Sequence, residues 1–194
     1  MKNGKISRMA QLALLLAVLL VMAFTPLGYL NIGPLSVTFL VIPVVVGAVV
    51  LGGRAGLALG LAFGITSFVQ CFGISAFGVA LMGIDPLATA LICIVPRVLV
   101  GLFSRLTFRA LEGRRIACYA ASAVGSLTNS VLFLGGIVVF FGNSEYLRSF
   151  GSNVFEILMA LGIGNAVVEV LVCTVVGGLL GNACLAYFGR RAQK

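Results

Sequence analysis

Residues 86–106 read PLATALICIVPRVLVGLFSRL, an almost wholly apolar run with one arginine, Arg97, near its middle and a second, Arg105, at its end. A run of about 20 mainly apolar residues is long enough to cross a bilayer as an α-helix. A charged side chain near the bilayer centre costs about 2.5–3.5 kcal/mol on insertion scales, so such residues usually have a functional role. The run therefore predicts a membrane fold, and Arg97 marks a candidate binding site inside it.

The rest of the chain has the same apolar character. Of its 194 residues, 61% are hydrophobic and only 9% are charged, and the mean hydropathy is +1.19. Soluble domains carry about 25% charged residues, so we expect an all-α integral membrane protein that forms a single domain over residues 1–194. The first apolar run, residues 10–27, exceeds the signal-peptide core of about 7–15 residues, and we expect it to be retained as a helix.

Apolar segments long enough, or nearly long enough, to cross the bilayer occur six times along the chain. The last segment is longer than a bilayer requires. Glycine weakens a helix interior, so we expect this last segment to begin at the interface or to break near GIGN, residues 162–165. The prediction is a bundle of six transmembrane helices over residues 10–27, 35–53, 55–75, 86–106, 116–141 and 155–188.

The distribution of basic residues predicts the orientation of this bundle, because cytoplasmic loops of membrane proteins are enriched in Lys and Arg. With six spans and a cytoplasmic N-terminus, both termini are cytoplasmic. The net charge of +8 then reflects orientation, and no nucleic-acid partner is expected. Eleven of the 13 basic residues fall on the cytoplasmic side in this arrangement, namely Lys2, Lys5, Arg8, Arg54, Arg105, Arg109, Arg114, Arg115, Arg190, Arg191 and Lys194.

Few strongly polar side chains lie inside the predicted spans. At a rise of about 1.5 Å per residue, Arg97, Asn129 and Glu169 lie about 16–18 Å from the outer ends of their helices, and Asn165 lies about 12 Å in. Three helices thus bring polar groups to a similar depth, which predicts one polar chamber in the outer half of the bundle. Arg97 and Glu169 either form a structural ion pair or hold a ligand, and the sequence leaves both interpretations open.

A segment between the first two spans also favours a small-molecule site. GYLNIGPLSVTF, residues 28–39, reads as an outer loop interrupted by Gly and Pro. A few convergent polar groups in an apolar lining are typical of ligand pockets. We therefore include Tyr29, Asn31 and Thr38 among the candidate substrate-binding residues.

The fifth span contributes a second polar segment, GSLTNS at residues 125–130. It places Thr128 beside Asn129, and we include Thr128 among the candidate substrate-binding residues. For any single hydroxyl the alternative is a hydrogen bond to its own helix backbone.

What the chain lacks excludes several classes of function. It contains no histidine, and therefore no Ser–His or HExxH constellation, and it has no GxxxxGK[ST] phosphate-binding loop. We expect neither an enzyme nor an ATPase site of its own, and no cofactor or metal. The five cysteines form no CxxC pair and are expected to be buried small hydrophobes.

Small residues recur at helical spacing in three places, one of them Gly177 with Gly181. Gly56, Gly60 and Gly64 are expected to let two helices pack closely inside the bundle. Ala13 and Ala17 on the first helix either pack internally in the same way or dock a partner subunit.

Four blocks, in the same order, resemble the substrate-binding S components of energy-coupling factor (ECF) vitamin transporters, most of all the pantothenate-type members. The resemblance implies a six-helix protein of the bacterial cell membrane that binds a vitamin from the outside. It also implies a transmembrane coupling subunit and two cytoplasmic ATPase subunits as partners, with the AxxxA pattern at Ala13 and Ala17 contacting the coupling subunit. The blocks are NIGPLSVTFLVIPVVVGAVVLGGRAGLALGLAFGITS (residues 31–67), PRVLVG (96–101), GSLTNSVLFLGGIVVFFG (125–142) and GNAVVEV (164–170).

For a pantothenate-type substrate, the resemblance gives the polar residues roles. Pantothenate carries a carboxylate, hydroxyl groups and an amide, and an arginine offers planar, bidentate recognition of a carboxylate. We expect Arg97 to anchor the anion, with Asn129 and Glu169 as polar orienters. Asn165 is expected to hydrogen-bond the hydroxyl and amide groups together with these two. The resemblance also implies that Tyr29, Asn31 and Thr38 form a gating outer loop.

The identity of the vitamin stays open. Pantothenate-type members often carry a histidine just before an Ile-Pro pair, where this chain has Val41. An S component for another vitamin or metabolite is the alternative, and a cationic ligand would make Glu169 the anchor. From another class, a self-sufficient secondary carrier driven by an ion gradient also remains, although the two halves of the chain show no convincing resemblance to each other.

Overall fold

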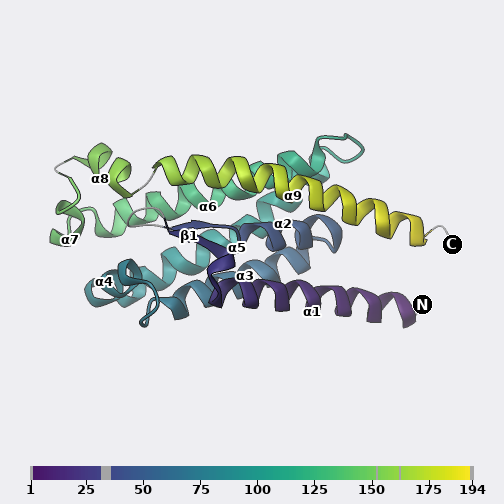
Figure 1. The fold of residues 1–194 in the computed structure, drawn as a ribbon, viewed down its shortest axis with the longest axis horizontal. Helices are drawn as coiled ribbons and strands as arrows, with labels where there is room; N and C mark the ends of the chain where they lie inside the picture. The colour runs from purple at the N-terminus through teal and green to yellow at the C-terminus, as the bar shows by residue number, and fades with distance from the viewer. Residues whose placement is uncertain (1, 32–35, 152, 162, 193–194) are drawn as a thin grey trace.

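The computed structural model of the chain describes residues 2–31, 36–151, 153–161 and 163–192. These residues form a bundle of helices that run roughly along one axis, with one short pair of strands near its middle (Figure 1). In chain order the elements are α1 (Lys2–Phe24), the 3₁₀ turn η1 (Pro26–Gly28), β1 (Tyr29–Asn31), β2 (Ser36–Thr38), α2 (Val41–Val50), α3 (Gly53–Gln70), α4 (Ala76–Ile84), α5 (Pro86–Ala110), α6 (Ala117–Phe141), α7 (Glu145–Arg148), α8 (Val154–Leu161) and α9 (Ile163–Ala192).

Four helices of the described residues are long and apolar enough to cross a membrane. They are Lys5–Phe24 in α1, Pro86–Ala110 in α5, Ala117–Phe141 in α6 and Gly164–Tyr187 in α9. The two helices between α1 and α4 are shorter, with 10 residues in α2 and 18 in α3. The chain is therefore a helical, multi-pass membrane protein, and spans at α2 and α3 remain a prediction.

The helix expected over residues 35–53 is shorter in the structure and follows a strand. β2 pairs antiparallel with β1, so that Tyr29 lies opposite Thr38 and Asn31 lies opposite Ser36. α2 begins only at Val41. Hydropathy alone does not separate a short apolar strand from a helix, which explains the difference. The hairpin thus occupies a part of the bundle that a full-length helix would fill.

α4 is a helix of nine residues that is too short for a hydropathy pattern to reveal. The segment expected over residues 55–75 ends as helix at Gln70. Ser75 and Asp85 then cap α4 and α5, each accepting hydrogen bonds through its side chain from backbone N–H groups of the following turn. α4 therefore lies as a short separate helix beside the start of α5.

The last expected segment, residues 155–188, corresponds to two helices. α8 ends at Leu161 and α9 begins at Ile163. Residue 162 between them lies outside the described residues, so the break expected near residues 162–165 stays a prediction. From there α9 runs along the bundle to Ala192 (Figure 1).

Both ends of the chain lie at the same end of the bundle, on the right in Figure 1. The loop that joins α5 to α6 and carries Arg114 and Arg115 lies at this end too, whereas α4, α7 and α8 lie at the opposite end. This arrangement matches the predicted separation of basic residues, while the side of the membrane that each end faces remains a prediction.

Close packing of α3 against α5 depends on a row of glycines. A Cβ atom at Gly60 would collide with the backbone oxygen of Arg97 on α5. A Cβ atom at Gly64 would come too close to the α5 backbone at Ile94. Gly56 faces Gly101 in a similar way. The row packs inside the bundle, as predicted, and it holds α3 directly against the part of α5 that carries Arg97.

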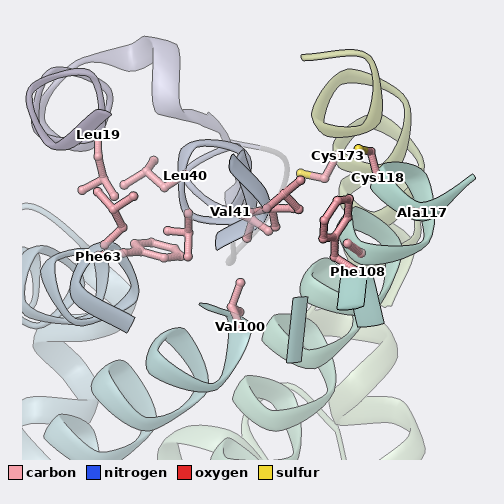
Figure 2. Close-up of a cluster of buried hydrophobic side chains, with 14 of the residues drawn as sticks. Leu19, Leu40, Val41, Phe63, Val100, Phe108, Ala117, Cys118 and Cys173 are labelled. Atoms are coloured by element: carbon pink, nitrogen blue, oxygen red, sulfur yellow. The ribbon is translucent and has the colours of Figure 1, made fainter. Parts of the chain in front are cut away.

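The main hydrophobic core joins α1, α2, α3, α5, α6 and α9. Figure 2 shows side chains from several of these helices converging, among them Leu19, Val41, Phe63 and Val100. Eight of the 10 residues of α2 are buried. Although α2 is short, its burial in this core fixes its position and that of the hairpin that precedes it.

Candidate ligand-binding site

A cavity of about 620 Å³ lies between the β1–β2 hairpin and α3, α4, α5, α6 and α9. Its volume falls within the range of about 300–1,000 Å³ that is usual for small-molecule sites. Its lining includes residues of α4, and α4 lies at the end of the bundle opposite the two termini (Figure 1). Its polar lining includes Tyr29, Ser36, Thr38, Ser67, Gln70, Ser75, Thr89, Arg97, Asn129, Ser130, Asn165 and Glu169.

Glu169 on α9 joins three elements in the cavity wall and is only 5% exposed. Its Oε1 accepts hydrogen bonds from Asn129 Nδ2 at 2.9 Å and from Ser130 Oγ at 3.3 Å, both on α6. Its Oε2 accepts a hydrogen bond from the backbone N–H of Thr38 at 3.2 Å. The carboxylate therefore ties the hairpin to α6 and α9, and burial makes each of these donors costly to lose.

Arg97 on α5 is also 5% exposed, and its guanidinium is held on several sides. Nη1 donates a hydrogen bond of 2.6 Å to the backbone oxygen of Ile92. Cζ lies 4.3 Å from the ring centroid of Phe133 and 5.4 Å from that of Phe63, within cation–π distance of both rings. Nε is buried and has no hydrogen-bond partner. The Nε–H donor of the guanidinium is thus unused.

The ion pair that the sequence left open between Arg97 and Glu169 is not formed. Within the described part of the chain, Glu169 is bonded by the amide, hydroxyl and backbone groups given above, and Arg97 is bonded by a carbonyl. A buried charge without an ionic partner is expensive. An anion in the cavity would supply the partner that the protein itself does not provide for Arg97.

Two further polar atoms of the cavity lining are buried without a partner. They are the hydroxyl of Tyr29 and Oδ1 of Asn129. The Asn129 amide donates to Glu169 through Nδ2, so its oxygen remains as a hydrogen-bond acceptor. Buried polar atoms are nearly always satisfied in native structures, so these atoms, like Arg97 Nε, are suited to contact a ligand.

Six of the eight substrate-site residues expected from the sequence line this one cavity: Tyr29, Thr38, Arg97, Asn129, Asn165 and Glu169. Thr128 lies elsewhere. Its hydroxyl donates to the backbone oxygen of Val124 at 2.7 Å, and it lines a small apolar hollow of α5 and α6. Asn31 pairs with Ser36 in the hairpin, and its side chain is outside the described part of the structure.

Several cavity residues were not among the expected ones, including Ser130, Phe133, Phe63 and Ser67. The signal that finds most of them is helical spacing, because residues three or four apart share a helix face. Phe133 lies four residues after Asn129 on α6, and Phe63 and Ser67 lie four residues apart on α3. Ser130 is adjacent to Asn129, so this spacing does not identify it.

Two cysteines also meet at the cavity wall. The sulfur atoms of Cys71 and Cys93 lie 3.8 Å apart, and both residues are buried. Among the described residues, no group of three or more His, Cys, Asp or Glu side chains is placed to hold a metal ion. The described cavity lining therefore offers one guanidinium, one carboxylate, two thiols, neutral polar groups and aromatic rings.

Comparisons with known proteins extend over the whole of this site. A family model described as "ECF transporter, substrate-specific component" matches residues 7–187. The Pantothenic acid transporter PanT of Lactococcus lactis subsp. cremoris (strain MG1363) is 31% identical to the chain over 187 residues, which cover 90% of this chain and 92% of that protein. Both similarities therefore include the stretches that form the cavity.

Proposed function

The chain belongs to the family of ECF transporter substrate-specific components, and from this premise we propose that its cavity binds pantothenate for uptake across the bacterial cell membrane. Membership makes the chain a multi-pass membrane protein of solute transport. Pantothenate is the proposed ligand because the related PanT is named a pantothenic acid transporter and because the cavity has complementary chemistry.

The observation that carries the proposal is the buried Nε of Arg97, which has no hydrogen-bond partner. Pantothenate is an anion at neutral pH, and a carboxylate matches the planar fork of a guanidinium with two parallel hydrogen bonds. Nη1 is already bonded to Ile92, whereas Nε has no partner. A carboxylate bound side-on would take one hydrogen bond from Nε and one from Nη2.

The remaining polar groups suit the other end of the ligand. The buried Oδ1 of Asn129 is a free acceptor, and a carboxylate such as that of Glu169 offers about four lone-pair positions, of which three accept hydrogen bonds here. Pantothenate has hydroxyl donors at the end opposite its carboxylate. The cavity thus combines a cationic group with a set of acceptors, as the ligand combines an anionic group with a set of donors.

The proposed orientation places the cavity toward the outside of the cell and both termini in the cytoplasm. The termini and the basic α5–α6 loop lie at one end, and α4, which contributes to the cavity lining, lies at the other (Figure 1). Residues 28–39 would then form the outer gate. Because Thr38 in this segment bonds to Glu169, a ligand that contacts Glu169 also affects the gate.

We assign Ala13 and Ala17 on α1 to contact with a partner subunit. Both residues are exposed, and only 11% of the membrane-spanning window of α1 is buried within the chain. Close approach of small residues is how helices associate in lipid. The proposed partner is a transmembrane coupling subunit that works with two cytoplasmic ATPase subunits, since the chain has no phosphate-binding loop of its own.

The test is isothermal titration of the purified protein in detergent with pantothenate, repeated with Arg97→Ala and Arg97→Lys. Removing one partner of a buried, hydrogen-bonded charge pair should weaken binding by about a hundredfold or more. Lysine keeps the positive charge but lacks the planar guanidinium that forms two parallel hydrogen bonds. We therefore expect the pantothenate affinity of Arg97→Lys to lie between those of the wild type and Arg97→Ala. Arg105→Ala is the matched control, because Arg105 lies on the same helix and outside the cavity lining.

Two results would contradict the proposal in different ways. A wild-type protein that does not bind pantothenate would exclude this ligand and direct the search to other vitamins. Binding that survives in Arg97→Ala would leave pantothenate as the ligand but exclude Arg97 as its anchor.

A further inference from the structure

We propose that Pro96 positions the guanidinium of Arg97 for anion binding by leaving the backbone carbonyl of Ile92 free to accept its hydrogen bond. The inference rests on the proposed function, in which Arg97 receives the carboxylate of the ligand. It gives a role in ligand binding to a residue whose side chain has no polar group.

The argument begins with the hydrogen bonds of an α-helix, in which each N–H donates to the carbonyl four residues earlier. The donor for the carbonyl of Ile92 would be the N–H of residue 96. Residue 96 is proline, which has no N–H and whose ring also crowds that carbonyl. Pro96 lies inside the continuous helix α5, well away from its first turn, so the Ile92 carbonyl has lost its normal helical partner.

Arg97 supplies the replacement donor. Its Nη1 lies 2.6 Å from the Ile92 oxygen, and a hydrogen bond from a charged donor is stronger than one between neutral groups. Side chains on a helix lean toward its N-terminus, which brings the guanidinium back over the preceding turn. The proline and the arginine are adjacent in sequence, and one creates the acceptor that the other uses.

This hydrogen bond decides which edge of the guanidinium remains available. Phe133 and Phe63 lie against the planar group at 4.3 and 5.4 Å, and the Ile92 carbonyl engages Nη1. Nε is left as a buried donor without a partner. These contacts therefore hold the guanidinium of Arg97 in one orientation before the ligand binds, which lowers the entropic cost of binding.

An N–H group at position 96 would compete for the same carbonyl. A helical N–H aligned with the axis would take the place of Nη1 on this carbonyl, and the guanidinium would become free to rotate. We expect Pro96→Ala to weaken pantothenate binding by about tenfold, the equivalent of one hydrogen bond to a charged group. Pantothenol, in which an alcohol replaces the carboxylate, should lose less than about twofold, because it does not use the fork of Arg97.

A matched variant distinguishes the effect of the missing N–H group from the effect of the proline ring. In a second protein, Pro96 is replaced by the α-hydroxy acid analogue of alanine, introduced by nonsense suppression, which has neither ring nor N–H. This variant should bind pantothenate as the wild type does. Pro86→Ala is the control within the same helix, because Pro86 stands at its first position, where a missing N–H breaks no helical bond.

A measurement without ligand tests the role of Pro96 even if pantothenate is not the substrate. Nη groups held by hydrogen bonds rotate slowly and give separate NMR signals, so ¹⁵N-arginine labelling should show a restrained Arg97 in the wild type and a mobile one in Pro96→Ala. Comparison with Arg97→Lys assigns the signal. Equal Arg97 mobility in both proteins, or equal loss of pantothenate affinity in the alanine and α-hydroxy variants, would overturn the role of Pro96. Absence of wild-type pantothenate binding would instead overturn only the proposed ligand.

Discussion

Asn129 on α6 donates a hydrogen bond of 2.9 Å to Glu169 on α9, and the two side chains are 3% and 5% exposed. This bond fixes the direction of the Asn129 amide, because Nδ2 must face the carboxylate. The amide oxygen is then left without a partner. The pair therefore does two things at once: it joins two helices of the bundle, and it presents an acceptor that can receive a donor from a ligand.

The pair gives a prediction about stability that can be tested with a reciprocal exchange. Asn129→Asp puts two carboxyl groups at hydrogen-bond distance and should destabilise the protein strongly, and Glu169→Gln should do so more mildly. In the double variant, Gln at 169 can donate to Asp at 129, so we expect a favourable coupling of about 1–3 kcal/mol between the two changes. Thermal unfolding in detergent measures it.

Glu145→Gln is the control for the loss of one carboxylate, since Glu145 is exposed, and it should leave the melting temperature unchanged. Effects of Asn129→Asp and Glu169→Gln that simply add would mean that the bond between the two side chains contributes little.

Packing beside Arg97 gives a second prediction, at Gly60. A methyl group there would collide with the backbone oxygen of Arg97. We expect Gly60→Ala to cost about 1–3 kcal/mol of stability through overpacking and to weaken pantothenate binding, because α5 must shift. Gly135→Ala is the matched control: Gly135 is also inside a helix, but a methyl group at this position would have no neighbouring atom within 4 Å. Thermal melts and titrations of both variants decide whether α3 supports the position of Arg97.

The level along the bundle at which these side chains lie could be predicted from the sequence, because the rise per residue of a helix is nearly constant. Arg97, Asn129 and Glu169 were expected at one level from counting alone, and all three line the same cavity. The direction in which a side chain points around the helix axis has to be predicted separately, since neighbouring residues point about 100° apart. Thr128 is adjacent to Asn129 in sequence but faces the apolar hollow between α5 and α6.

The elements that escaped prediction are those in which hydropathy does not encode conformation. Val37 and Leu40 are fully buried, yet one lies in a strand and the other precedes a helix. Both are apolar, so a continuous span over residues 35–53 fits their hydropathy equally well. The proposed role of Pro96 cannot be predicted from hydropathy or composition either. It depends on which backbone carbonyl loses its helical donor when residue 96 has no N–H group.

The facing cysteines provide a third prediction, on access to the cavity. Cys71 and Cys93 line it, with sulfur atoms 3.8 Å apart. A small methanethiosulfonate reagent should reach them through the same opening as the ligand, and saturating pantothenate should slow their modification. Cys184 is only partly buried and is outside the cavity lining, so its modification should not change. Mass spectrometry of Cys71→Ser and Cys93→Ser assigns the protected sites, and equal rates with and without pantothenate would place the ligand elsewhere.

The exposed face of α1 gives the last prediction, which separates binding from transport. Ala13 and Ala17 are exposed one turn apart on a helix that the rest of the chain barely covers. Leucine at both positions adds bulk where close approach of another helix requires small residues, while leaving the cavity untouched. The double variant should therefore titrate with pantothenate as the wild type does, yet fail to co-purify with a coupling subunit and lose most uptake in cells. Ala183→Leu, a change of the same size on the exposed surface of α9, should keep both. Loss of binding in the double variant would show that these alanines support the fold, and full uptake would show that α1 does not carry the docking face.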